Sequence, residues 1–433
     1  MVTAAVGYHE SPLDVARINF EASAGRVLAE PDLRLLLSAC SRDVRFELPV
    51  RLDNGELRLF QALRTHHHSG RGPHLGGLRF SPAISSGLMF ALAQTLTWKA
   101  ALAGVHFSGS MGGVLCDPAE LSIAEVERIT RAYVARLQPL LGPFQDVLQP
   151  ELSSSPQIAA WIHNEYAAHL NPIPGASRDD SEPAALACVV GKPEAGGGIA
   201  GREQAVARGV LGLLRRIAEE RGKTLGELRV ALYGCTGVSR GLEQICARYI
   251  QSDTRASKSG GDIQEYTNSG TALAAAVRQM GRKGTEVPDT PDGEVSGPEA
   301  VLQADCDVLI LAGNECAVHA GNAAKIVAPV IVEAADLSVA SAADQILARK
   351  GAVVIPSLVA NAGVVIAAYL EWDANLRQVS IGTEAAGREI EERVLKAYDA
   401  VRQRAMERSQ TLRAAAYDIA LDRVAAVERL RAP

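Results

Sequence analysis

RVALYG, residues 229–234, is a short and mostly apolar run, and it is the first of a series of such runs in the second half of the chain. A long amphipathic helical stretch (203–221) precedes it, and VLIL (308–311), PVIVE (329–333) and AVVIP (352–356) follow, separated by further helical stretches. Short buried strands that alternate with helices are typical of a parallel, doubly wound sheet. The fold class predicted for this half is therefore α/β with a Rossmann-like sheet.

The first half of the chain has the pattern of a different unit. Residues 42–63 alternate apolar and polar positions around Asp-Asn-Gly at 53–55, where Asn-Gly favours the positive φ of a hairpin turn. Between residues 85 and 103 apolar side chains recur at three- and four-residue steps after a serine that can cap a helix. Residues 119–141 and 156–169 are predicted to form further helices. We expect a first domain of mixed sheet and helices, with a cleft between it and the Rossmann-like domain.

The composition excludes several classes of function. The chain has 433 residues, of which 47% are hydrophobic, so its length favours two domains. A net charge of −6 provides no basic surface for nucleic acid or for an anionic membrane, and no apolar run has the length of a signal peptide core or a membrane span. The seven cysteines include no CxxC pair, which favours reduced thiols over disulfides or a zinc site. We expect a cytoplasmic protein whose partners are small molecules or other proteins.

Three consecutive histidines, His66 to His68, raise the question of a metal site. Successive residues of a strand point to alternate faces, so three in a row do not converge on one ion. We expect structural roles for these histidines and no metal.

Several motifs occur in an order and spacing that resemble the glutamate dehydrogenase family, within the Glu/Leu/Phe/Val dehydrogenase superfamily. In the first half they are RTHHHSGRGPHLGGLRFSP (64–82), ALAQTLTWKAAL (91–102), SGSMGGVLCDP (108–118), AAWIHNEY (159–166) and GKP (191–193). In the second half they are DCDVLILAG (305–313) and ANAGVVIAAYLEW (360–372). The resemblance covers most of residues 45–375 and implies a substrate and assembly domain, a nucleotide domain, and usually a hexamer.

The resemblance also implies that the catalytic positions have changed. The family's catalytic lysine exchanges a proton during oxidative deamination, and its position here is Met111. A thioether has no proton to exchange, and the loss of a general acid–base group typically costs roughly 10²–10⁴-fold in rate. The family's partner aspartate is Glu151 here, one methylene longer. We therefore predict that the chain alone is inactive.

One end of an amino-acid site is retained. The resemblance implies that Lys99 binds the α-carboxylate of the substrate. The lysine and serine that hold the distal carboxylate of glutamate are replaced by Leu75 and Ala368, which leaves that carboxylate without partners at a cost of several kcal/mol. We infer a leucine-like ligand, with Lys99 on its carboxylate and Glu151 on its amine. Two alternatives remain open: Lys99 extends to the surface from an apolar helix face, or Glu151 is a passive remnant.

The nucleotide motif has also changed. A dinucleotide-binding turn needs Gly-x-Gly-x-x-Gly, whereas residues 234–239 read Gly-Cys-Thr-Gly-Val-Ser, which keeps the first glycine in register. The candidate for the acidic residue that binds the ribose, Asp253, follows the glycines at a shorter distance than in the family pattern, so we expect the second strand and its ribose carboxylate to be missing. By resemblance, Val206 replaces a threonine that contacts nicotinamide and Asp336 replaces an asparagine near the cofactor. This puts NAD(P) binding in doubt at the candidate positions Gly234, Thr236, Ser239, Val206 and Asp336, and we expect no cofactor.

These observations favour a regulatory subunit that assembles with an active glutamate dehydrogenase paralogue as a hetero-hexamer and binds an amino-acid effector such as leucine. One alternative is an active, NAD(P)-linked amino-acid dehydrogenase, with branched-chain amino acids as candidate substrates, and another is a stand-alone amino-acid sensor. The expected domains are residues 1–200 for substrate binding and assembly, 201–360 for the degenerate Rossmann-like unit, and 361–433 for C-terminal helices that return to the first domain. An insert at 176–188 lies in a loop that could cap the cleft or contact a partner.

Overall fold

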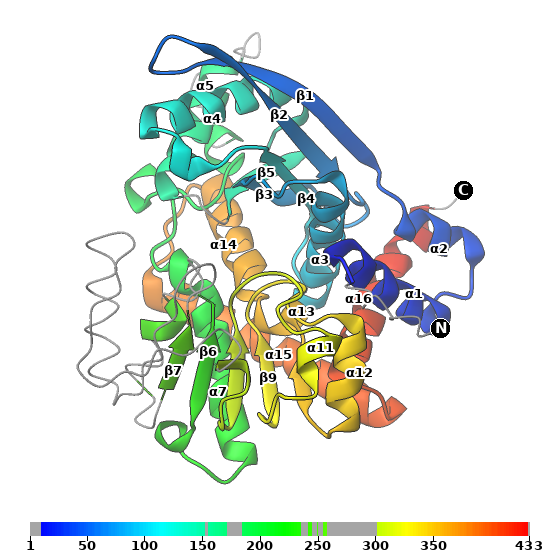
Figure 1. Ribbon diagram of the computed structural model, residues 1–433. Coiled ribbons are helices and arrows are strands. Elements are labelled where there is room, and N and C mark those ends of the chain that lie inside the picture. The colour runs from blue at the N-terminus through cyan, green and yellow to red at the C-terminus, as the bar shows by residue number, and fades with distance from the viewer. Residues whose placement is uncertain are drawn as a thin grey trace, which may run out of the picture.

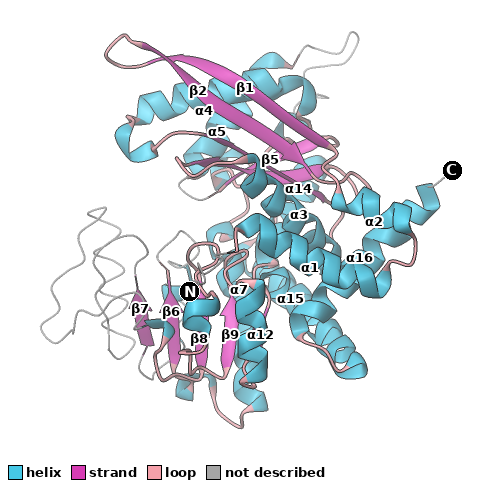
Figure 2. Cartoon of the chain, turned by 45° about the vertical axis from the view of Figure 1, so that its right-hand side comes forward, coloured by secondary structure: helices cyan, strands magenta, loops and turns pink. Residues whose placement is uncertain are grey.

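The computed structural model describes residues 10–151, 155–170, 184–234, 241–244, 249, 254–257 and 301–431. Within them the chain forms two α/β units, each built on its own sheet (Figures 1 and 2). Helices α3 (Ser86–Ala103) and α14 (Gly363–Arg377) lie between the two sheets. The predicted two-domain α/β architecture is confirmed.

The first sheet is mixed, with strand order β1-β2-β4-β3-β5. The hairpin of β1 and β2 is antiparallel and β2 pairs antiparallel with β4, whereas β3 runs parallel to both of its neighbours. Gly55 has a φ of 87°, which the expected hairpin turn requires. The strands are β1 (Arg42–Arg51), β2 (Leu57–His66), β3 (His74–Phe80), β4 (Ser108–Val114) and β5 (Asp146–Pro150).

The helices of the first unit follow the local signals in the sequence. Ser85 caps α3 by accepting a hydrogen bond from the backbone N–H of Leu88, and Gly104 ends that helix in the left-handed conformation. The helix expected over 119–141 is shorter, because Ser122 and Glu125 form a capping box that starts α4 at Ile123. The remaining helices of this unit are α1 (Pro12–Val27), α2 (Pro31–Ser38), α4 (Ile123–Leu137) and α5 (Pro156–His169).

The second sheet is parallel, with strand order β10-β9-β8-β6-β7. The order reverses between β6 and β8, and the crevice at such a switch point is where doubly wound sheets bind their ligands. Its strands are β6 (Val230–Tyr233), β7 (Thr254–Ser257), β8 (Val308–Leu311), β9 (Val330–Glu333) and β10 (Val353–Ile355). The labelled helices over residues 205–360 are α7 (Ala205–Glu220), α11 (Ala320–Ala323), α12 (Ser341–Arg349) and α13 (Ser357–Ala360).

The strand β7 corrects one expectation. We expected the second strand of this domain to be missing, but the backbone of 254–257 pairs with 230–233 along the edge of the sheet. Backbone pairing with β6 compensates for the weak β-propensity of this short segment. Asp253 lies outside the described residues, as do 176–183 of the insert.

The C-terminal helices connect the two units. Helix α15 (Thr383–Arg408) packs against α7, and α16 (Leu412–Arg431) packs against α1 and α3 of the first unit (Figure 1). Arg423 of α16 donates to the carbonyls of Ala101 and Leu102 at the end of α3, at 2.8 and 2.7 Å. Among the helices of the described residues, none is both long and apolar enough to cross a membrane.

Candidate functional site

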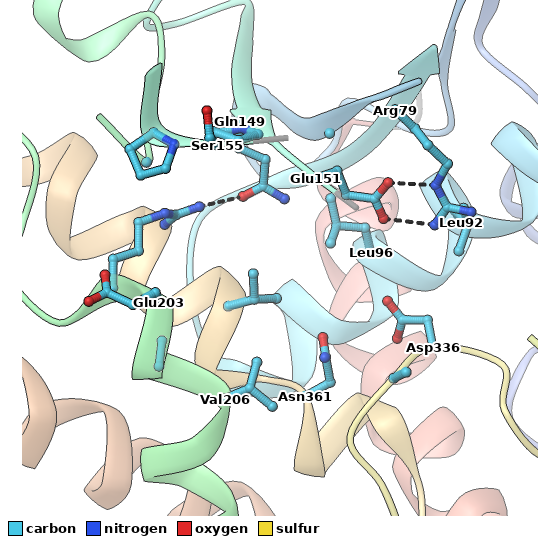
Figure 3. A pocket seen from close by; sticks show the side chains of 18 of the residues that line it. Arg79, Leu92, Leu96, Gln149, Glu151, Ser155, Glu203, Val206, Asp336 and Asn361 are labelled. Carbon is cyan, nitrogen blue, oxygen red and sulfur yellow. Dashed lines mark hydrogen bonds and ion pairs between the residues drawn. The ribbon is translucent and has the colours of Figure 1, made fainter. Parts of the chain in front are cut away.

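A cavity of about 720 Å³ lies between the two units, with walls from both (Figure 3). The first unit contributes residues of β3, β4 and β5 and one face of α3, and the walls from the second unit include the segments that follow β8 and β9. Its walls combine charged side chains with apolar ones. The charged residues are Arg79, Lys99, Glu151, Lys192, Glu194, Arg202, Glu203, Glu315 and Asp336, and the larger apolar ones are Leu92, Leu96, Met111, Ile199, Val206 and Val364.

Lys99 is at the cavity wall and is fully buried on α3. Its Nζ lies 2.7 Å from Asp336 Oδ2 and 2.6 Å from Asn361 Oδ1. Asn361 is oriented by its own amide, which donates to the carbonyl of Ala334 at 2.6 Å. From the sequence, Lys99 was expected to bind the amino acid and Asp336 to lie near the cofactor. The structure brings these two residues into direct contact. The alternative in which Lys99 extends to the surface is wrong.

Arg79 connects a carboxylate of its own unit with a carboxylate of the second unit. Its guanidinium donates to both oxygens of Glu151, at 2.7 and 2.9 Å (Figure 3). It also donates to Glu315 Oε1 at 2.9 Å. Burial opposes the charge of Arg79, but the two carboxylates outweigh it and raise the pKa of Arg79 above its usual value. Glu151, the expected amine ligand, is thus held in a bidentate ion pair within its own domain.

Met111 fills the space beside this pair. It is 4% exposed on β4, and a Cβ added to Gly77 on the neighbouring strand would come within 2.6 Å of Glu151 Cβ and 3.1 Å of Met111 Cε. The terminal methyl group of Met111 and the aliphatic part of Glu151 therefore both pack around Gly77, and Met111 occupies the position where the family resemblance implies a lysine. The side chain at position 111 thus offers no ionisable group for proton transfer.

Leu75 and Ala368 lie elsewhere. Both are fully buried and belong to one hydrophobic core cluster, and neither is among the residues that line the cavity. Leu75 lies two residues before Gly77 on β3, so its side chain is on the same face of the sheet as position 77. Unlike Gly77, it is part of the hydrophobic core and does not line the cavity. The apolar wall of the cavity is formed instead by Leu92, Leu96 and Val364.

The far end of the cavity is polar. Arg202 donates to Gln149 Oε1 at 3.0 Å (Figure 3). Lys192, from the GKP motif, is buried against Glu371 at 2.9 Å and against the carbonyls of Leu186 and Val189. The backbone N–H of Gly191 also donates to Glu371, so one carboxylate fixes the conformation of the whole motif.

No role was predicted from the sequence for Arg79, Glu315, Arg202 or Asn361. Arg79 and Asn361 lie inside the recognised motifs LGGLRF and ANAG. Their positions in these motifs could have identified them as candidate site residues. Glu315 and Arg202 carried no comparable signal, because their relevance comes from contacts with distant parts of the chain.

Only part of the predicted nucleotide turn lies in the described residues. Gly234 follows β6 with a φ of 105°, and a Cβ there would come within 2.4 Å of the Gly313 backbone, so this position requires glycine. Val206 lines the cavity from α7. Thr236 and Ser239 lie outside the described residues. Gly234 and the switch point beside it thus fit the first turn of a dinucleotide site.

The three histidines have structural contacts, as expected. His66 Nε2 lies 2.7 Å from Asp146 Oδ2, and His67 is hydrogen bonded to Leu37 and Thr97, while His68 pairs with Glu428. Within the described part of the chain, no group of three or more His, Cys, Asp or Glu side chains is placed to hold a metal ion.

Comparison with protein families gives two matches that together cover most of the chain. A model described as the Glu/Leu/Phe/Val dehydrogenase dimerisation domain matches residues 41–168. A second, described as glutamate/leucine/phenylalanine/valine dehydrogenase, matches residues 197–431.

Individual proteins agree with this result. The chain is 32% identical to a glutamate dehydrogenase of Thermotoga maritima over 98% of each chain. It is 33% identical to glutamate dehydrogenase A2 of Halobacterium salinarum over 91% of this chain and 92% of that protein. Among solved structures, the Leu-bound form of the hetero-hexameric glutamate dehydrogenase from Thermus thermophilus is similar with a TM-score of 0.87 at 32% identity, covering 98% of this chain and 99% of that one.

These matches correct the expectation about cofactors. We predicted that the chain takes none, but the matching models and relatives are those of NAD(P)-dependent dehydrogenases. The prediction gave too much weight to the changed glycine spacing at 234–239 and to a second strand that is in fact present as β7. Gly234 and the parallel sheet are the described features that such a nucleotide would use.

Proposed function

The chain belongs to the Glu/Leu/Phe/Val dehydrogenase family, and we propose that within it the chain is a non-catalytic regulatory subunit that assembles with an active glutamate dehydrogenase paralogue. Its role is to bind an amino-acid effector such as leucine and to change the activity of the paralogue. The assembly is a hetero-oligomer of the hexameric kind.

The observation that carries this proposal is the packing of Met111 beside Glu151. Oxidative deamination needs a group that accepts and returns a proton at this point, and a thioether has none. Glu151 does not compensate, because Arg79 holds both of its oxygens. A missing proton carrier blocks the chemical step whether or not NAD(P) is bound, so the proposal is independent of the cofactor.

Two further observations support the effector and the partner. The Thermus thermophilus relative is a hetero-hexamer with Leu bound. In this chain the cavity is lined by a buried ammonium, Lys99, by a carboxylate, Glu151, and by the apolar residues Leu92 and Leu96. A branched aliphatic amino acid presents the complementary groups, with a carboxylate for Lys99 and an amine for Glu151.

The test is a steady-state assay of glutamate oxidation by the chain alone, by the purified paralogue, and by the two together, each with and without leucine. We expect no turnover by the chain alone and a leucine-dependent change in the mixture. The variant Lys99→Met serves as the effector-site control and should reduce the leucine response. Robust turnover by the pure chain would contradict the proposal and favour an active amino-acid dehydrogenase. Tight leucine binding without any association with the paralogue would favour a stand-alone sensor.

A further inference from the structure

The ion pair of Lys99 and Asp336 joins the two domains across the cavity. Lys99 is on α3 of the first unit, and Asp336 follows β9 in the second. An ammonium has three donors, and Asp336 and Asn361 occupy two of them at 2.7 and 2.6 Å. Asp336 Oδ1 is buried and has no hydrogen-bond partner, so the carboxylate is held at the cavity wall mainly through Lys99.

We propose that Asp336 is an internal carboxylate that competes with the amino-acid ligand for Lys99 and holds the cleft together when no ligand is bound. The family resemblance places a neutral asparagine at this position, and a neutral amide does not offer Lys99 a second negative charge. A carboxylate fixed to the fold is present at a high effective concentration, so a free amino acid must displace it. Asp336 thus sets the affinity of Lys99 for an amino-acid carboxylate and also acts as a latch between the domains.

A second set of contacts crosses between the same two units. Arg79 on β3 reaches Glu315 beyond β8 at 2.9 Å. Glu10, which precedes α1, accepts hydrogen bonds from the backbone N–H groups of Ser341 and Ala342 at the start of α12, at 2.6 and 3.1 Å. Among these contacts between the two units, the Lys99–Asp336 pair is the one that involves the ammonium proposed to bind the carboxylate of the amino acid. Ligand binding and separation of the domains at this point are therefore coupled through a single ammonium.

The competition with an amino acid rests on the proposed function, whereas the latch rests on the contacts alone, so the two can be tested separately. The variant Asp336→Asn keeps the size of the side chain and removes its charge. Asp305→Asn is the matched control, because Asp305 is 83% exposed and pairs with Arg229 on the surface of the same domain. Hydrogen–deuterium exchange of α3 and of residues 334–340 in the ligand-free chain measures the latch, and calorimetric titration with leucine measures the competition.

We expect faster exchange in both segments of Asp336→Asn and leucine affinity higher by about tenfold or more, with neither change in Asp305→Asn. Exchange that is no faster than in the parent chain would overturn the latch. Leucine binding of equal affinity in the parent and in Asp336→Asn would overturn the competition. Faster exchange without leucine binding to either protein would support the latch and would instead count against the effector site of the proposed function.

Discussion

Lys99 Nζ and Asp336 Oδ2 lie 2.7 Å apart, although 236 residues separate them in the chain and they belong to different domains. Lys99 is fully buried, while the side chain of Asp336 is 23% exposed at the cavity wall. A buried ammonium is tolerated only when its charge is compensated, so the stability of this region depends on both domains being in place.

The first prediction concerns the strength of this pair. Lys99→Met removes the ammonium and leaves Asp336 and Asn361 without their shared donor, which should lower the free energy of unfolding by about 3 kcal/mol. The double variant Lys99→Met with Asp336→Asn removes the uncompensated charge and should recover part of that loss. Urea denaturation of the four proteins of this double-mutant cycle measures the coupling. Strictly additive effects would contradict a direct interaction.

The second prediction concerns two glycines with different surroundings. A Cβ at Gly76 would lie 1.7 Å from the carbonyl oxygen of Ser110 on β4, whereas a Cβ at Gly25 in α1 has nothing within 4 Å. Gly76→Ala should therefore destabilise the first domain by more than about 3 kcal/mol, and Gly25→Ala should stabilise the chain by about 0.5–1 kcal/mol because alanine favours helix. Thermal unfolding of both variants measures the difference. Equal unfolding midpoints of the two variants would show that β3 and β4 can move apart at Gly76 without a loss of stability.

Local sequence signals were sufficient for much of the fold. The alternation at 42–63, the serine before α3 and the apolar runs at 308–311 and 329–333 are local, and each gives the corresponding element within a few residues. Strand β7 was missed because backbone pairing with β6, and not side-chain character, determines it.

The site was less predictable, for a physical reason. The resemblance identified Lys99, Met111, Glu151, Val206 and Asp336, all of which line the cavity. It did not give their partners, because the contacts of Lys99 with Asp336 and of Arg79 with Glu315 form only when the two domains pack together. The burial of Leu75 and Ala368 was not predictable for the same reason, since both belong to a core cluster that forms only when α14 packs against α3, α7 and α15.

The third prediction concerns the buried pair of Arg64 and Asp146 in the first sheet. Arg64 donates to both oxygens of Asp146, at 2.6 and 2.9 Å, and to the carbonyl of Gly77 at 2.8 Å. Arg64→Met leaves a buried carboxylate uncompensated and should cost about 3–5 kcal/mol.

The matched control is Arg45→Met. Arg45 pairs with Asp43 at 3.0 Å but is 68% exposed, so its loss should change stability by no more than about 0.5 kcal/mol. Urea denaturation at neutral pH measures both variants. A loss at Arg64 as small as that at Arg45 would mean that His66 and Ser110, which also contact Asp146, are sufficient to compensate its charge.

The fourth prediction concerns the pH dependence of stability through His67. Burial lowers the pKa of His67 to about 3, against the opposing effect of its hydrogen bond to the Leu37 carbonyl and with a smaller contribution from the charges of His68 and His74. The unfolded chain, with a histidine pKa near 6.5, therefore binds a proton that the folded chain excludes between about pH 6.5 and pH 3. The contribution of His67 to stability is complete above about pH 6.5 and is lost as the pH falls, by about 2 kcal/mol at pH 5.

His67→Gln should remove this dependence, although it also lowers stability at pH 7 by loosening the contacts with Leu37 and Thr97. The quantity to compare is thus the difference in the free energy of unfolding between pH 7 and pH 5, measured by urea denaturation at fixed ionic strength. That difference should shrink by about 2 kcal/mol in His67→Gln relative to the parent chain. His169→Gln, at an exposed position on α5, is the matched control for the removal of a histidine. An unchanged difference in His67→Gln would show that His67 is accessible to protons in the folded chain, and hence that the packing of α2 and α3 around it opens at acidic pH.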